Sequence, residues 1–147
     1  MSDLLVEIED QRLRQLLAYW ESKRQGRRFP ARADLDPLEF HYLLGWISIL
    51  EVSHNPRRFR YRLNGSLLVE RFGVDMTGKY LDEFPKPEFR TMLERRWGAA
   101  VDAGRPVHEF HNRIVDRHRY DFETLRLPLA SDGETVDMLL VASVHRH

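Results

Sequence analysis

Histidine and carboxylate side chains lie close together in the last third of the chain, and these are residue types that bind metal ions. His108, Glu109 and His111 fall within four positions of one another, which suggests a metal site. If residues 106–115 form a strand, however, His108 and His111 point to opposite faces and cannot bind one ion without a bulge. The sequence therefore predicts no metal site here.

The same region offers groups for acid–base catalysis. His111, Tyr120, Asp121 and Glu123 could serve a small isomerase or dehydratase with an apolar pocket. No spacing selects them, and the chain has no G-x-S-x-G, phosphate-loop or H-E-x-x-H motif. The absence of cysteine excludes disulfides and thiol catalysis. We therefore expect a binding protein without catalytic residues, with the small isomerase or dehydratase as an alternative.

Arginine is the side chain best suited to anion binding. Arg62 and Asn64 share one face of a predicted strand, and Arg62 could hold a carboxylate or phosphate through two parallel hydrogen bonds. Alternatively, Arg62 pairs with Asp75 or Glu83, or lies exposed. The chain has 23 basic and 23 acidic residues and a formal net charge of zero. A nucleic-acid binder would normally show a basic surplus, so we expect no nucleic-acid partner.

The first predicted element is a helix over residues 10–25, preceded by an arm of residues 1–9. Asp10 is placed to cap its start, and Gly26 can end it. Apolar residues at positions i, i+3, i+4 and i+7 make one stripe, which consists of Leu13, Leu16, Leu17 and Trp20. We expect this stripe to cover the sheet of its own chain or to form the interface of a homodimer. A second helix is predicted to begin at Asp36-Pro37.

Five strands and a long helix are predicted after residue 45. Residues 59–64 alternate between apolar and polar side chains, the period of a strand with unlike faces. The other predicted strands span residues 46–52, 106–115, 120–129 and 136–144, and the helix runs from Pro87 to Ala103. The apolar run 138–142 indicates a strand covered on both faces. The N-terminal helix is the candidate for the second cover.

Two short segments carry the most specific pattern. FRYRLNGS, residues 59–66, is typical of a strand that stops at Asn64-Gly65, and GVDMTG, residues 73–78, is typical of a tight turn with a glycine at each end. Further signature positions precede them: Trp20, Pro30, Arg32, Asp34, Asp36 and Pro37. In these segments and in its order of elements, from residue 10 to 145, the chain resembles the PAS domain family, and in particular a compact bacterial branch of it.

The resemblance implies an α+β fold and a single domain over residues 10–147. This fold is a five-stranded antiparallel sheet with helices on one face and an N-terminal capping helix. A cavity is expected between the sheet and the helices. The candidates to line it are Trp46, Tyr61, Arg62, Asn64, Phe72, Tyr80, Trp97, Phe110 and Phe122. The alternative is that these aromatic side chains simply fill the core.

The resemblance implies a stand-alone sensory module that binds a small molecule or a protein partner and signals by association. We expect a homodimer and an unidentified signalling protein as partners, with a ligand-free interaction domain as the alternative. The cofactor stays undetermined: residues 87–103 lack a histidine for a haem, and the chain lacks the cysteine of light-sensing flavin domains. No secretory signal or membrane segment is recognised, so we expect a cytoplasmic protein without a membrane partner.

Overall fold

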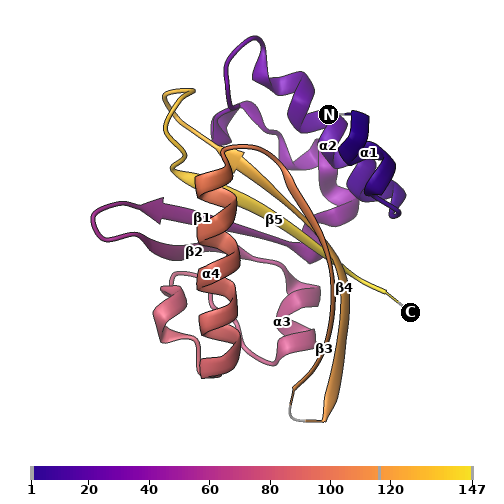
Figure 1. Cartoon of the computed structure of the whole chain (residues 1–147), viewed down its shortest axis with the longest axis vertical. Helices are drawn as coiled ribbons and strands as arrows, with labels where there is room; N and C mark the ends of the chain where they lie inside the picture. Colours follow the sequence, from indigo (N-terminus) through magenta and orange to yellow (C-terminus); the bar gives the residue numbers. More distant parts are fainter. Residues whose placement is uncertain (1, 116, 147) are drawn as a thin grey trace.

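The computed structural model describes residues 2–115 and 117–146, and its centre is a five-stranded antiparallel sheet (Figure 1). The strands lie in the order β2-β1-β5-β4-β3. Their bounds are β1 Ile47–Ser53, β2 Arg58–Asn64, β3 Val107–Val115, β4 His118–Leu129 and β5 Met138–His145. The predicted α+β fold with a five-stranded antiparallel sheet is confirmed.

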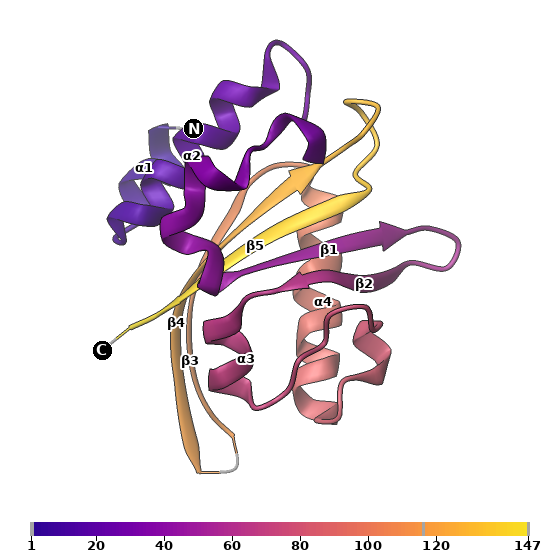
Figure 2. The same ribbon diagram turned by 180° about the vertical axis from the view of Figure 1, so that it is seen from behind.

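Helices cover both faces of the sheet. The face towards α3 (Ser66–Phe72) and α4 (Pro87–Ala103), here the inner face, also borders the short 3-10 turn η3 (Leu81–Glu83). The outer face is covered by α1 (Ser2–Glu7) and α2 (Gln11–Arg24), followed by the 3-10 segments η1 (Arg32–Asp34) and η2 (Pro37–Trp46). Helix α4 therefore lies in front of the sheet in Figure 1 and behind it in Figure 2.

The apolar stripe of α2 packs on its own sheet. Asp10 caps the helix by accepting a hydrogen bond from the Arg12 backbone N–H at 2.8 Å. All four stripe residues are at most 2% exposed, namely Leu13, Leu16, Leu17 and Trp20. Trp20 Nε1 also donates to the carbonyl of Pro128 in β4 at 2.9 Å. The stripe therefore covers the sheet of its own chain, which is one of the two alternatives expected for it.

A buried carboxylate fastens the N-terminal segment to the outer face. Glu123 of β4 is 2% exposed and accepts hydrogen bonds from the backbone N–H of Glu9 at 2.8 Å and of Asp10 at 2.9 Å. His108 Nε2 of β3 lies 2.7 Å from the same carboxylate. Because a carboxylate can only accept, His108 donates this bond. Glu123 therefore supplies the partners for two N–H groups at the start of α2, which the helix itself leaves unpaired.

The proline-rich segment after α2 is fixed by Asp34. Its carboxylate accepts from the Ala31 backbone N–H at 2.8 Å and from Arg27 at 2.7 Å. These two hydrogen bonds, the backbone bond first, lower the pKa of Asp34 below its ordinary value. Asp36 then caps the following segment through the Leu38 N–H at 3.0 Å. That segment consists of 3-10 turns rather than the predicted α-helix, and it is kinked at Phe40, which has non-helical dihedral angles (φ −132°, ψ 30°) and a fully buried side chain.

The pairing of β1 with β2 contains an irregularity at Arg62. Ile49 pairs with Leu63, whereas Leu50 pairs with Tyr61, so Arg62 is an extra residue on β2. A bulge of this kind shifts the alternation of side chains. Tyr61 and Asn64 consequently share the inner face, and Arg62 does not join Asn64 there.

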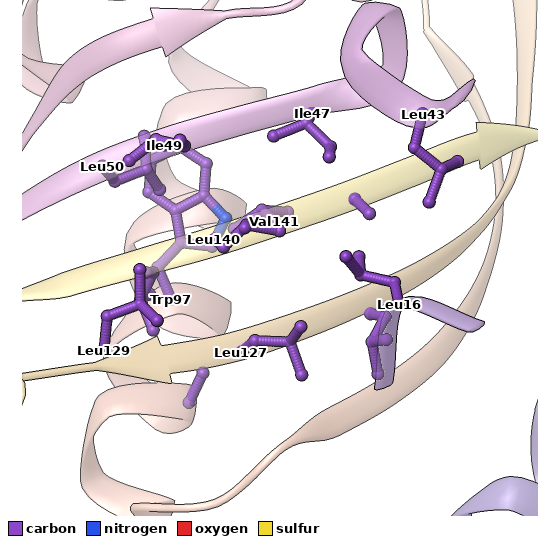
Figure 3. Close-up of a cluster of buried hydrophobic side chains, with 14 of the residues drawn as sticks. Leu16, Leu43, Ile47, Ile49, Leu50, Trp97, Leu127, Leu129, Leu140 and Val141 are labelled. Carbon is purple, nitrogen blue, oxygen red and sulfur yellow. The ribbon is translucent and has the colours of Figure 1, made fainter. Parts of the chain in front are cut away.

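The core lies on both faces of the central strands (Figure 3). Leu16, Leu43 and Leu127 lie on the outer side, whereas Trp97 of α4 packs against the sheet from the inner side. The middle of β5 is covered on both faces, as expected, since residues 139–142 are each at most 5% exposed.

Candidate functional site

A cavity of about 310 Å³ lies between the inner face of the sheet and the helices α3 and α4. Its apolar lining is largely aromatic, with Tyr61, Leu68, Phe72, Val74, Phe84, Phe89, Met92, Leu93, Trp97, Phe110, Tyr120, Phe122 and Val141. Its polar lining comprises Ser48, Asn64, Arg96, His111, Asn112, Thr124, Arg126 and Ser143. This combination of an apolar wall with a few polar groups is typical of small-molecule sites.

Helical and strand periodicities explain which side chains reach the cavity. In β4, every second residue from 120 to 126 lines it, because successive side chains of a strand alternate between faces. In α4, the lining residues are Phe89, Met92, Leu93, Arg96 and Trp97, which follow the i, i+3, i+4, i+7, i+8 spacing of one helix face.

The glycine-bounded turn 73–78 positions Tyr61. Gly78 has a positive φ of 83°, a conformation that glycine adopts without strain. Its N–H donates to the Tyr61 carbonyl at 2.7 Å, and the Tyr61 N–H donates to the Lys79 carbonyl at 2.8 Å. Asp75 holds the turn by accepting from the Thr77 backbone N–H at 2.9 Å. Burial raises the pKa of Tyr61 above its ordinary value, so its phenol is neutral at physiological pH.

Stacked and edge-on rings form the wall of the cavity around Phe72. Its ring stacks on Tyr120, with centroids 5.0 Å apart and planes at 4°, and on Phe122 at 5.6 Å. Phe89 meets Phe72 edge-on at 5.4 Å. Offset stacks and edge-on pairs are the favoured arrangements of aromatic rings, so this wall is a preformed apolar surface.

A cluster of charged groups forms the polar part of the site. Arg126 of β4 has a side chain that is 2% exposed and pairs with Glu109 of β3 at 2.7 Å. Arg96 of α4 reaches the other oxygen of Glu109 at 3.3 Å. Burial lowers the pKa of Arg126, the pairing with Glu109 opposes this effect, and the charge of Arg96 adds to it.

Both arginines also contact His111 of β3. Its Nε2 lies 3.1 Å from Arg96 Nη1 and 3.3 Å from Arg126 Nη2. A guanidinium group can only donate hydrogen bonds, so Nε2 is the acceptor and the imidazole carries its proton on Nδ1. His111 is therefore neutral in this arrangement.

Three buried nitrogen donors in the lining residues have no hydrogen-bond partner within the described chain. They are Trp97 Nε1, His111 Nδ1 and Arg126 Nε. A buried donor without a partner costs about 1–3 kcal/mol, and such groups are rare in folded proteins. The residues that line the cavity thus include three buried donors that lack an acceptor within the described chain.

Six of the nine residues predicted to line a pocket do so: Tyr61, Asn64, Phe72, Trp97, Phe110 and Phe122. The ring of Phe110, however, lies beside His108 of the outer face, with 4.8 Å between ring centroids, and under the guanidinium of Arg146. Phe110 thus borders the cavity without turning its ring into it.

The other three predicted pocket residues lie outside the lining. Trp46 contacts Phe122 from another side, at 6.4 Å between ring centroids. Tyr80 stacks under Arg58 at 3.7 Å. The side chain of Arg62 is 59% exposed and lies 3.5 Å from Glu51, because the bulge in β2 removes it from the face of Asn64. Arg62 is therefore neither the anion site proposed from the sequence nor a partner of Asp75 or Glu83.

Arg96 and Arg126 were not predicted as site residues, and Glu109 was considered only as a metal ligand. A signal was present in β4, where Arg126 interrupts a run of buried apolar residues and must therefore have a partner. Arg96 and Glu109 had no comparable signal, since both belong to segments rich in charged residues.

The sheet divides the residues considered for metal binding and acid–base catalysis, with His111 and Tyr120 on its inner face and His108 and Glu123 on its outer face. His108 is bonded to Glu123 on the outer face, whereas His111 lines the cavity on the inner face, as the strand alternation predicted. Tyr120 lines the cavity, but Glu123 lies on the opposite face of the same strand. Within residues 2–115 and 117–146, no group of three or more potential ligands could hold a metal ion.

None of the described helices is both long and apolar enough to cross a membrane. No curated protein matches the chain. Among solved structures, the PAS domain of BvgS from Bordetella pertussis is similar, with 17% identity, coverage of 77% of this chain and 88% of that chain, and a TM-score of 0.55. The LOV protein of Rhodobacter sphaeroides has 11% identity, coverage of 76% and 68%, and a TM-score of 0.50.

These likenesses concern the fold. The match to a protein family covers more of the chain, since the sequence model of the family described as PAS domain matches residues 8–142. Together with the antiparallel sheet, its helical covers and the cavity between them, this match identifies the chain as a member of the PAS domain family.

Proposed function

We propose that this PAS domain is a sensory module that binds a small molecule in the cavity and signals by associating with a second copy or with another protein. The observation that carries the proposal is a cavity of about 310 Å³ that combines an aromatic wall with buried, unpaired polar groups. This volume lies at the lower end of the range typical of small-molecule sites. A ligand-free interaction domain would be expected to fill the space and pair its own donors.

Native mass spectrometry of the protein purified from cells tests the binding step, followed by denaturing analysis of any released compound. We expect a mass increment that disappears on denaturation. A protein that carries no small molecule, and that acquires none from a metabolite extract, would favour the ligand-free alternative.

A pair of variants on α4 tests whether the cavity is the binding site. Met92 lines the cavity, whereas Ala99 of the same helix is exposed and outside the lining. Met92→Trp should reduce the bound fraction strongly because the larger side chain occupies the cavity. Ala99→Trp introduces the same side chain on the surface and should leave the bound fraction unchanged. Equal effects of the two substitutions would place the ligand elsewhere.

Association is tested separately by sedimentation velocity over a range of protein concentrations. Because the α2 stripe is buried within its own chain, a homodimer needs another surface. We expect a concentration-dependent dimer whose population changes when the ligand is removed. A monomer at every concentration would exclude the homodimer and leave a different protein as the signalling partner.

A further inference from the structure

The charged side chains that line the cavity are basic. Among the described lining residues, Arg96 and Arg126 carry positive charge, His111 is neutral, and none is aspartate or glutamate. Glu109, which is outside the lining, pairs with both guanidinium groups. Two positive charges and one negative charge leave the cluster with a net charge of about +1. The wall of the cavity therefore presents one uncompensated positive charge.

The unpaired buried groups of the lining residues also favour an anionic ligand. Trp97 Nε1, His111 Nδ1 and Arg126 Nε are all donors, and the side chain of Arg126 is only 2% exposed. A donor is satisfied by an acceptor, and a charged acceptor forms the stronger bond. The net charge of the cluster and its unpaired donors both favour an anionic, acceptor-rich group.

We propose that the cavity selects a small organic monoanion, a carboxylate on an apolar body, with the carboxylate held by Arg96 and Arg126. The inference rests on the proposed function, since it names the ligand class of the same cavity. A carboxylate neutralises the single excess charge, whereas a doubly charged phosphate would leave the cluster negative. A carboxylate also accepts hydrogen bonds from guanidinium N–H groups, and Arg126 Nε has no partner within the described residues. The aromatic wall around Phe72 accommodates the apolar body.

Three probes with one body and different head groups test this selection by isothermal titration calorimetry. They are 3-phenylpropionate, 3-phenylpropan-1-ol and 3-phenylpropylammonium, titrated into the wild-type protein after ligand removal. We expect the carboxylate to bind at least about tenfold more tightly than the alcohol, because its hydrogen bonds to arginine are charge-assisted. The ammonium probe should not bind.

Two variants assign the selection to the arginines. Arg96→Met and Arg126→Met should each bring the affinities of the carboxylate and the alcohol to within about threefold of each other, since each removes a charge-assisted contact. Arg96 lies on a helix surface, so its variant keeps the test valid if Arg126→Met does not fold. Arg95→Met is the matched control, because Arg95 is exposed, adjacent on α4 and outside the lining. It should retain the wild-type preference.

Different binding results would overturn the carboxylate selectivity and the ligand-binding function. Equal binding of the carboxylate and the alcohol by the wild-type protein would overturn the anion selectivity and leave the cavity as a ligand site. Binding of none of the three probes, together with a protein that carries no small molecule from cells, would overturn both. A carboxylate preference retained in Arg96→Met and Arg126→Met would overturn the assignment to these two residues.

Discussion

Replacing Glu123 by glutamine should loosen the attachment of the N-terminal helices to the sheet. The carboxylate accepts two backbone N–H bonds through separate oxygens, and a third bond from His108. Glutamine has one acceptor oxygen, so its amide N–H₂ must face either the Glu9 or the Asp10 N–H. One charge-assisted bond is then lost and a buried donor is left without a partner. The free energy of unfolding should fall by about 2–3 kcal/mol, a net value that allows for the neutral amide being less costly to bury than the carboxylate. For a domain of this size, the melting temperature should fall by roughly 4–12 °C.

Equilibrium urea unfolding, followed by far-UV circular dichroism and by tryptophan fluorescence, measures this change. Trp20 lies on α2 and packs on β4, so fluorescence is sensitive to detachment of that helix. Glu9→Gln is the matched control: Glu9 is 65% exposed in its side chain and pairs with Arg146 at 3.1 Å, and exposed ion pairs contribute only about 0–1 kcal/mol. A Glu123→Gln protein within about 0.5 kcal/mol of the wild type would refute the reasoning.

Three further predictions concern a glycine contact, acid stability and the charged cluster. Gly65→Ala should lower the free energy of unfolding by about 2–3 kcal/mol, because the new Cβ would press on the Gly45 carbonyl and lie 2.8 Å from the Ile47 carbonyl oxygen. Gly98→Ala is the control: its Cβ would meet only the flexible end of the Arg57 side chain, so the substitution should be neutral or stabilising in the same urea assay. The lowered pKa of Asp34 means that its contribution to stability is present above the unfolded value near 3.9 and is lost as the pH falls through the lower folded value. Melting curves between about pH 5 and 2.5 should therefore fall less steeply for Asp34→Asn, and parallel curves would contradict this. Unliganded Arg126→Met should be as stable as the wild type or more stable by up to about 2 kcal/mol, since Glu109 keeps Arg96 as a partner. A clear loss of stability would show that the buried guanidinium stabilises the empty domain.

Much of the fold follows from local patterns in the sequence. The helix predicted between Pro87 and Ala103 has these bounds in the structure, because a proline at its start and Gly104 at its end limit it on both sides. The stripe of α2 and the doubly covered β5 likewise follow from their periodicity. The second helix differs, since it consists of 3-10 turns with a kink at the buried Phe40.

The site was harder to predict because it depends on register. A single extra residue in β2 moves Arg62 away from Asn64, and no local pattern reveals such a bulge. The charged cluster joins β3, β4 and α4 across 30 residues of sequence, from Arg96 to Arg126. Its members come together only through the pairing of β3 with β4 and the packing of α4 on the sheet. Aromatic positions were easier to identify, since their size places them in the interior wherever the strands alternate.

The position of Glu123 between Phe122 and Thr124 gives the domain a short route for communication. Its two neighbours line the cavity, while its own carboxylate holds the amides of Glu9 and Asp10 on the far side of the sheet. The thickness of one strand thus separates a bound molecule from the helical cover. A ligand that displaces or stiffens β4 acts on both sides at once, without a relay of intermediate side chains. Hydrogen exchange at the amides of Glu9 and Asp10 should consequently report on whether the cavity is filled, although neither residue lines it.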